Sequence, residues 1–239
     1  MNPPVPVVAA PLEEELAPFV ARIGGRAEYR GDDLSTHRGA INGRPVLAAV
    51  IGDGAGAAER GLTRLLTGIE PERLLLLGVA GGLSDDLTTG SLIQAAVVGS
   101  VAGDNLSAAP GSSIDGLSQG SVVTADRIVS TVDAKRELWD ALGRPPRCVV
   151  DVESWGVVER AAHLDVPWTV VRAVIDAADE DLPLDFGALS DAEGQVVRSR
   201  VLWSLLRKPV AMKGVLELRT RVRAGASDLA DVAERWLLA

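Results

Sequence analysis

The chain has 239 residues, of which 47% are hydrophobic, and its formal net charge is −9. Such a chain can bury the core of one α/β domain, and the negative charge excludes sequence-independent binding of nucleic acid by the whole surface. The first residues lack the basic and apolar regions of a signal peptide, and no run of about 18 apolar residues predicts a transmembrane span. We therefore expect a cytoplasmic protein without a nucleic-acid partner.

Hydrophobic periodicity in the first half of the chain predicts alternating strands and helices. Asn42 and Gly43 form a tight-turn signal between two strand-like runs, which predicts a hairpin and therefore a mixed sheet. The expected elements are a strand over 5–10, a helix over 12–23, paired strands over 27–41 and 44–51, a helix over 55–68, and strands over 73–79 and 90–99.

The second half continues this alternation after a stretch rich in Gly, Ser and Ala over residues 101–120. This stretch lacks periodicity and is either an active-site flap or a surface insertion. The elements expected after it are strands over 121–124, 147–152 and 167–175, helices over 131–142 and 154–164, and a helical tail over about 187–239. We predict a single domain over 1–239 with a three-layer α/β/α architecture and a mixed central sheet.

The tail contains a strongly basic segment. Residues 195–223 hold eight Arg or Lys side chains and one acid, Glu217, and apolar residues lie between them. Two interpretations stay open: the segment contacts an anionic membrane at the inner face, or it forms a helix pair with one solvated basic face.

Metal and cofactor signals are weak in this sequence. Cys148, the only cysteine, lies in an apolar run and is expected to be a buried structural thiol. His37 and His163 lack neighbours with metal-ligand spacing, so we predict no metal. Residues 52–57, Gly-Asp-Gly-Ala-Gly-Ala, approximate a dinucleotide fingerprint, but no acid follows about 20 residues later at a strand end. We expect a tight turn there and no cofactor.

Three acids follow strand-like runs: Glu15, Glu153 and Asp176. Ligands of open α/β sheets bind at the carboxyl ends of strands, so these acids are candidate site residues. The glycine-rich run 78–83 ends another buried strand, where small residues let a ligand approach the backbone. The alternative for each acid is structural, because acids also favour helix N-termini and cap turns.

The order of these motifs resembles the purine nucleoside phosphorylase and nucleosidase superfamily, most closely its methylthioadenosine/S-adenosylhomocysteine nucleosidase branch. The resemblance covers most of the chain. The motifs that carry it are Ala10-Pro11-Leu12-Glu13-Glu14-Glu15, Gly52-Asp53-Gly54, Gly78-Val79-Ala80-Gly81-Gly82-Leu83, Val123-Thr124-Ala125-Asp126, Val150-Asp151-Val152-Glu153-Ser154, and Val171-Arg172-Ala173-Val174-Ile175-Asp176.

The resemblance implies a role for each acid. Asp176 matches the general acid that protonates the leaving purine, and apolar neighbours would help it keep its proton. Glu15 matches the carboxylate that orients the attacking water, and Glu153 matches the residue that grips the ribose hydroxyls as an ionised carboxylate. Further substrate-binding positions implied by the resemblance are Val152, Ala80, Gly81, Ile128 and Val129.

We predict hydrolysis rather than phosphorolysis, because the three glutamates at 13–15 would repel phosphate. The segment from Asp181 to Pro209 resembles a hopanoid-biosynthesis-associated subgroup, which implies adenosylhopane as the substrate. The alternatives are a methylthioadenosine, S-adenosylhomocysteine or futalosine nucleosidase and a purine nucleoside phosphorylase. Ile175 and Val152 replace the family's usual Ser and Met, which also suits a silent nucleoside- or lipid-binding protein. The family further implies a homodimer.

Overall fold

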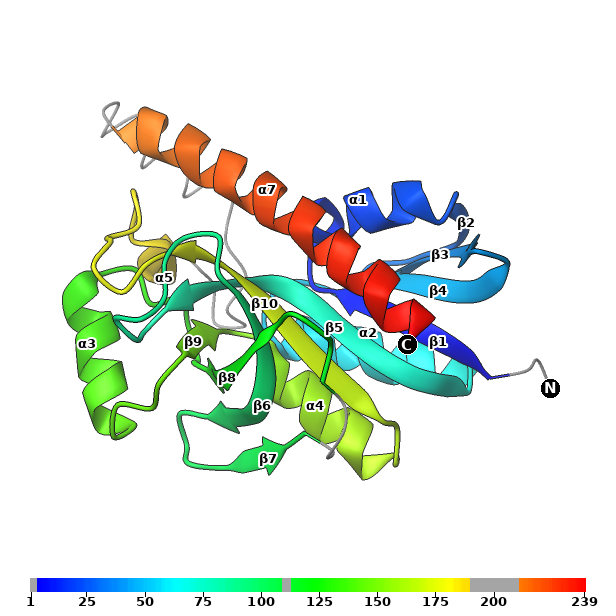
Figure 1. Ribbon diagram of the computed structural model, residues 1–239, viewed down its shortest axis with the longest axis horizontal. Helices are drawn as coiled ribbons and strands as arrows, with labels where there is room; N and C mark the ends of the chain where they lie inside the picture. The colour runs from blue at the N-terminus through cyan, green and yellow to red at the C-terminus, as the bar shows by residue number, and fades with distance from the viewer. Residues whose placement is uncertain (1–3, 109–112, 190–210) are drawn as a thin grey trace.

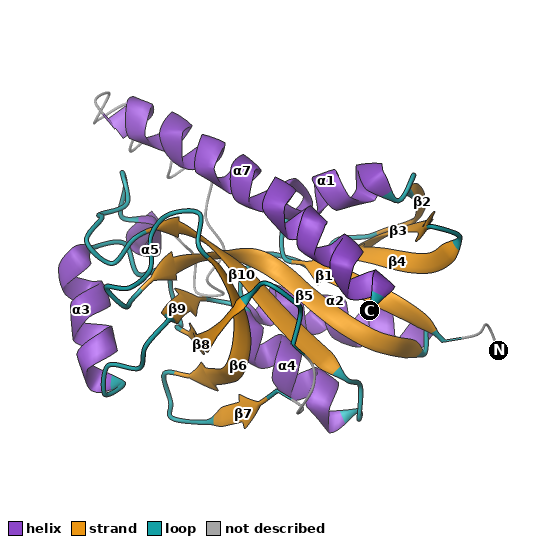
Figure 2. Ribbon diagram, viewed as in Figure 1, coloured by secondary structure: helices purple, strands orange, loops and turns teal. Residues whose placement is uncertain are grey.

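One mixed sheet of ten strands forms the centre of the computed structural model, which describes residues 4–108, 113–189 and 211–239 (Figures 1 and 2). The strands are β1 (Val5–Ala10), β2 (Arg26–Arg30), β3 (Ser35–Ile41), β4 (Arg44–Val50), β5 (Pro71–Gly82), β6 (Leu92–Ser100), β7 (Asn105–Ser107), β8 (Ser118–Thr124), β9 (Cys148–Asp151) and β10 (Trp168–Asp176). Their order is β10-β6-β8-β9-β5-β1-β4-β3-β2, with β7 paired to β6.

The long strand β5 organises the sheet. It pairs in parallel with β1 and with β10, and its last residues pair antiparallel with β9. Because β10 also pairs with β6, which continues through β8 to β9, five strands form a closed circuit. Gly81 lies opposite both Asp176 of β10 and Val150 of β9. The carboxyl ends of three strands therefore meet at this glycine.

Helices cover both faces of the sheet and complete three layers. They are α1 (Glu13–Arg22), α2 (Ala55–Gly68), α3 (Val132–Ala141), α4 (Ser154–His163), α5 (Phe186–Leu189) and α7 (Ala211–Leu238). Helices α2 and α4 contact each other on one face, where Leu62 and Val158 enter the larger core. Helices α1 and α7 lie together on the opposite face, where Phe19 and Leu229 are buried (Figure 1). The predicted three-layer α/β/α architecture is confirmed.

The predicted hairpin is present, and its turn explains the mixed sheet. Asn42 and Gly43 both have positive φ, at 49° and 79°, as a two-residue type I′ turn requires. The turn joins β3 and β4 in antiparallel register. The predicted strand over 27–41 is in fact two strands, β2 and β3, because the chain turns back between Arg30 and Ser35 and pairs with itself.

The structure describes parts of the two segments for which the sequence leaves alternatives open, residues 101–120 and the basic segment 195–223. Within residues 101–120, β7 pairs with β6 and the Ile114 amide donates to Gln94 Oε1 at 2.8 Å. Residues 190–210, with much of the basic segment and any helix pair there, lie outside the described residues. In the described part, Arg221 pairs with Glu180 at 2.8 Å and Lys213 with Glu217 at 3.7 Å, so ion pairs offset some of the basic charge.

Cys148 is fully buried, as predicted. Burial raises the pKa of its thiol to about 12, so the thiol stays protonated at neutral pH and is a poor nucleophile. Of the helices that the structure describes, none combines the length and the apolar character needed to cross a membrane.

Candidate active site

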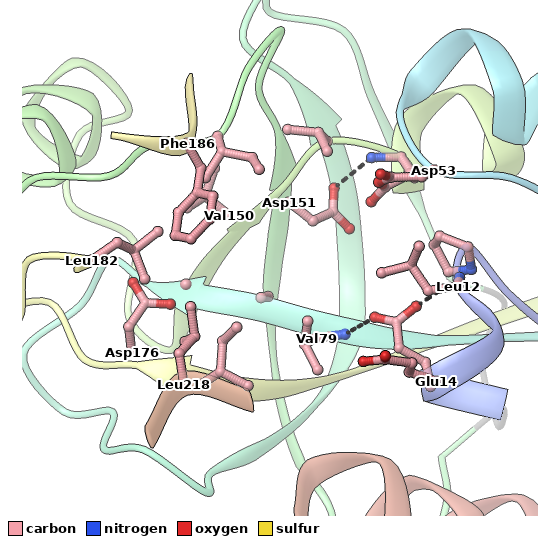
Figure 3. Close-up of a pocket in the computed structure, with 18 of the residues that line it drawn as sticks. Leu12, Glu14, Asp53, Val79, Val150, Asp151, Asp176, Leu182, Phe186 and Leu218 are labelled. Atoms are coloured by element: carbon pink, nitrogen blue, oxygen red, sulfur yellow. Dashed lines mark hydrogen bonds between the residues drawn. The ribbon is translucent and has the colours of Figure 1, made fainter. Parts of the chain in front are cut away.

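A cavity of about 600 Å³ opens where the ends of β1, β5, β9 and β10 meet (Figure 3). Figure 3 shows Asp176 beside Leu182 and Leu218 at one end, and Leu12 and Glu14 at the other. No described residue of the 101–120 stretch lines it. The eight residues predicted from the sequence all line this cavity: Glu15, Ala80, Gly81, Ile128, Val129, Val152, Glu153 and Asp176.

Glu15 lies in the first turn of α1 and is held by backbone amides on both carboxylate oxygens. Its Oε2 accepts from the Leu12 amide at 3.0 Å, which caps the helix, and its Oε1 accepts from the Val79 amide of β5 at 2.9 Å (Figure 3). Burial raises the pKa of Glu15 to about 6, although the nearby Arg172 acts in the opposite direction. Glu15 therefore caps the helix and also faces the cavity, ionised for the most part at neutral pH.

Glu153 is joined to the turn before α2. The Gly54 amide donates to Glu153 Oε1 at 3.0 Å, and Gly54 has a φ of 83°, which favours glycine. The glycine motif thus presents an amide to a carboxyl group. Burial, followed by the charge of Asp151, raises the pKa of Glu153 to about 8. The raised pKa favours the protonated form of Glu153 at neutral pH, in contrast to the ionised carboxylate predicted from the sequence.

A buried ion pair below the cavity connects β9, β10 and α4. Arg172 has no exposed surface, and its Nε lies 2.7 Å from Asp151 Oδ2 while its Nη2 donates to Ser154 Oγ at 2.9 Å. Asp151 Oδ1 also accepts from Thr124 Oγ1 at 2.8 Å. Arg172 Nη1 is buried, and no described residue accepts a hydrogen bond from it. This network fixes the start of α4 and hence the position of Glu153.

The position of Arg172 explains one glycine of β5. A Cβ built on Gly78 would lie 1.8 Å from Arg172 Nη1 and 3.4 Å from Glu15 Oε1. The guanidinium and the Glu15 carboxylate therefore converge on the same point of β5, and only glycine leaves them room. No role for Arg172 is predicted from the sequence, although a single arginine in an apolar strand is a usable signal of a buried ion pair.

Asp176 ends β10 and is 4% exposed. Lys135 of α3 lies with its Nζ 2.5 Å from Asp176 Oδ2. Burial raises the pKa of Asp176 above its usual value, although the Lys135 ammonium acts in the opposite direction. Burial acts on Asp176 in the direction expected from its apolar neighbours, but a buried cation also lies against the carboxyl group, which the sequence does not predict. Nothing in the pattern of the predicted helix over 131–142 distinguishes Lys135 from a surface lysine.

The cavity is acidic. Its lining among the described residues includes seven acids and no Lys, Arg or His. The described residues also contain no group of three or more His, Cys, Asp or Glu that could hold a metal ion. A neutral or cationic ligand with hydrogen-bonding groups suits this lining better than an anion does.

The raised pKa of Glu153 predicts a pH dependence of stability. Because its pKa is about 8 in the folded chain against 4.5 for a free side chain, its contribution is fully present below pH 4.5 and is lost as the pH rises through 8. We expect the stability of the protein relative to Glu153→Gln to fall over this range, by up to about 1.4 kcal/mol per pH unit. Urea unfolding at several pH values measures it. Glu59→Gln, at an exposed position of α2, is the control, and a pH-independent difference for Glu153→Gln would contradict the prediction.

Comparison with known proteins identifies solved structures that share the fold of this chain. Residues 7–98 match the sequence model of the Phosphorylase superfamily. A mutant of 5′-methylthioadenosine/S-adenosylhomocysteine nucleosidase from Helicobacter pylori, solved with 5′-methylthioadenosine in its active site, superposes with a TM-score of 0.75 at 15% identity over 98% of both chains. The enzyme of the same name from Neisseria meningitidis, in complex with methylthio-immucillin-A, gives 0.74 at 16% identity over 98% of both chains.

A futalosine hydrolase mutant from Helicobacter pylori also superposes, with a TM-score of 0.74 at 15% identity over 98% of both chains. These likenesses span the chain nearly end to end, including β8, β9 and β10, which lie beyond the sequence match. The chain therefore has the nucleoside phosphorylase/hydrolase fold, and its residues 7–98 carry the sequence pattern of the Phosphorylase superfamily.

Proposed function

We propose that this chain is a nucleoside N-ribosyl hydrolase that releases adenine from an adenosyl compound. The observation that carries the proposal is the convergence of Asp176, Glu15 and Glu153 on one cavity, from three separate parts of the chain. Each side chain is less than 9% exposed, and burial raises the pKa of all three. Buried acids with raised pKa values in a cleft are a signature of acid–base chemistry.

Asp176 is the proposed general acid. Adenine is a poor leaving group as an anion, and a proton delivered to a ring nitrogen lets it depart neutral. The burial of Asp176 favours the protonated form that this step needs. The apolar side chains of Ile128, Val129 and Phe186 line the cavity with Asp176 and would contact the faces of the base.

Glu15 is the proposed base. Its carboxylate accepts a proton from water as the water oxygen bonds to the anomeric carbon, while the glycosidic electron pair leaves with adenine and Asp176 donates its proton. The products are adenine and the free sugar; solvent then returns a proton to Asp176 and removes one from Glu15. Two backbone amides fix the Glu15 carboxylate. Glu153 would hold the ribose hydroxyls, positioned by Gly54.

Hydrolysis is favoured over phosphorolysis by the charge of the cavity. Phosphate needs convergent cationic donors, and the described lining offers seven acids and no basic side chain. Arg172, the buried cation below the cavity, already pairs with Asp151 through Nε and with Ser154 through Nη2. Water, which is neutral, meets no such repulsion.

We propose adenosylhopane as the substrate, with methylthioadenosine, S-adenosylhomocysteine and futalosine as the competing soluble nucleosides. Apolar side chains near the cavity support a lipid-linked nucleoside. Leu218 of α7 lines the cavity, and Met212 and Leu216 of the same helix are 46% and 56% exposed. Exposed apolar side chains on the helix that contributes Leu218 to the cavity would suit contact with a hydrocarbon substituent.

The test is release of the purine base from adenosylhopane, methylthioadenosine, S-adenosylhomocysteine and futalosine in parallel, each with and without phosphate, followed by chromatography of the base. We expect release that does not depend on phosphate. Selective turnover of adenosylhopane supports it as the substrate. A preference for one of the soluble nucleosides would make that nucleoside the substrate instead. Strict phosphate dependence, or binding without any turnover, would overturn the proposed hydrolysis.

A further inference from the structure

Lys135 is a buried lysine beside Asp176, which lines the cavity. It lies on α3, and its side chain has no exposed surface. Lysine is almost never fully buried unless its ammonium is paired, so its surroundings must satisfy a positive charge. Among the described residues, the polar partners of Lys135 lie at the end of β10 and in the segment after it, and they include the proposed general acid.

The Lys135 ammonium has three N–H donors, and three oxygens surround it. Nζ donates to the Ala177 carbonyl and to the Glu180 carbonyl, each at 2.7 Å. The third oxygen is Asp176 Oδ2 at 2.5 Å, an ion pair whose angles are outside those of a hydrogen bond. Two of the three N–H donors are therefore in hydrogen bonds, and the third oxygen interacts with the ammonium through its charge. Lys135 thus ties α3 to the end of β10.

The two carboxylate oxygens of Asp176 have different surroundings. Oδ2 is buried and lies 2.5 Å from Lys135 Nζ, and a Cβ built on Gly81 would lie 3.2 Å from Oδ2 and 3.5 Å from Oδ1. Asp176 nevertheless lines the cavity. Because Oδ2 is enclosed, Oδ1 is the oxygen available to a ligand. The two oxygens therefore differ, because Oδ2 is buried against the cation and Oδ1 is left for a ligand of the cavity.

Other charged groups near Asp176 are largely offset by their own partners. Glu180, after β10, accepts from Arg221 of α7 at 2.8 Å and from the Ala177 amide at 3.1 Å. Arg221 also donates to the Ile175 carbonyl at 3.2 Å. Glu15 and Glu153 line the same cavity and are acids. Among the described residues, Lys135 is the cation that directly contacts the Asp176 carboxyl group.

We propose that Lys135 is a positioning residue for the general acid: it holds Oδ2 so that Oδ1 carries the proton toward the base. Its ammonium also stabilises the carboxylate that Asp176 becomes once the proton has moved to the leaving base. A charge that is already in place costs no reorganisation during the reaction. The role of Asp176 as general acid rests on the proposed function, but the pairing of Lys135 with Asp176 can be measured without turnover.

The experiment uses two variants and a control. Lys135→Met removes the charge and all donors, whereas Lys135→Gln removes the charge and keeps donors for the carbonyls of residues 177 and 180. Lys213→Met removes a lysine whose side chain is 87% exposed. For each protein, ¹³C NMR follows the titration of the Asp176 carboxyl group, assigned with Asp176→Asn, and the pH profile of adenine release is recorded.

Both Lys135 variants should raise the pKa of Asp176, because removing a neighbouring cation favours the protonated carboxyl group. The alkaline limb of the rate profile should move to higher pH. The maximal rate should fall by about tenfold or more, which is part of the rate enhancement that general acid catalysis contributes. Lys213→Met should change neither. A merely structural anchor would lower the rate without moving the titration, and an unmoved titration in either folded variant overturns the proposal.

Wild-type protein supplies a measurement that needs no variant. The chain has three lysines, so ¹⁵N-lysine labelling gives a simple spectrum in which the Lys135 Nζ signal should shift at the pH where Asp176 titrates. Absence of that shift overturns the proposal even if the variants do not fold. If wild type releases no base from any nucleoside, the proposed function fails and the catalytic role of Lys135 with it. A shift of the Lys135 Nζ signal would then still show the ion pair with Asp176. Failure of the proposed function can therefore be distinguished from failure of the ion pair.

Discussion

Replacing Asp176 with Asn is expected to lower the rate of adenine release by about 10²–10⁴-fold, the contribution of a positioned general acid. Asn has nearly the same shape, and its amide oxygen can face Lys135 in place of Oδ2. Its NH₂ group can donate a hydrogen bond to the base but cannot transfer a proton. Binding of the nucleoside should therefore persist while turnover is lost.

Stopped assays of adenine release and isothermal titration with the same nucleoside measure the two effects separately. Asp179→Asn is the matched control, since Asp179 is exposed and three residues further along the chain. It should keep wild-type rate and affinity. Full activity of Asp176→Asn would remove Asp176 from the mechanism, and a loss of binding equal to the loss of rate would assign it a binding role only.

Replacing Arg172 with Met should lower the free energy of unfolding by about 3–5 kcal/mol, the usual cost of removing one partner of a buried ion pair. The Asp151 carboxylate would keep Thr124 and Ser154 as hydrogen-bond partners but would lose its counter-charge. Arg172 also lowers the pKa of Glu15, so the variant should need a higher pH before Glu15 ionises. Urea unfolding and the acidic limb of the rate profile report these two effects.

A double variant separates the ion pair from packing. Adding Asp151→Asn to Arg172→Met removes the uncompensated charge and should recover part of the lost stability, which a double-mutant cycle expresses as a coupling free energy. Arg30→Met is the surface control: its pair with Glu13 is 3.9 Å long and its side chain is 84% exposed, so a change within about 0.5 kcal/mol is expected. If Arg172→Met lowers the free energy of unfolding by no more than this control does, the buried pair does not stabilise the site.

Local patterns in the sequence were sufficient for most elements of the fold. The run 5–10 and the helix after it were predicted within one residue at each end, and Asn42-Gly43 indicated the hairpin that makes the sheet mixed. Such features depend on neighbouring residues, through side-chain periodicity and turn geometry. The same reasoning placed Glu15, Glu153 and Asp176 at strand ends, and the structure brings all three to one cavity.

The sequence by itself determined the elements and the acids that end them, because periodicity and chain order are local properties. Only the tertiary structure decided which groups touch: Gly54 meets Glu153 across 99 residues, Lys135 faces Asp176, and Arg172 lies under Glu15. Burial and charge at these contacts set the raised pKa values of the acids. Desolvation and ion pairing act through space, so they depend on how distant segments pack and have no signature in the spacing of residues along the chain.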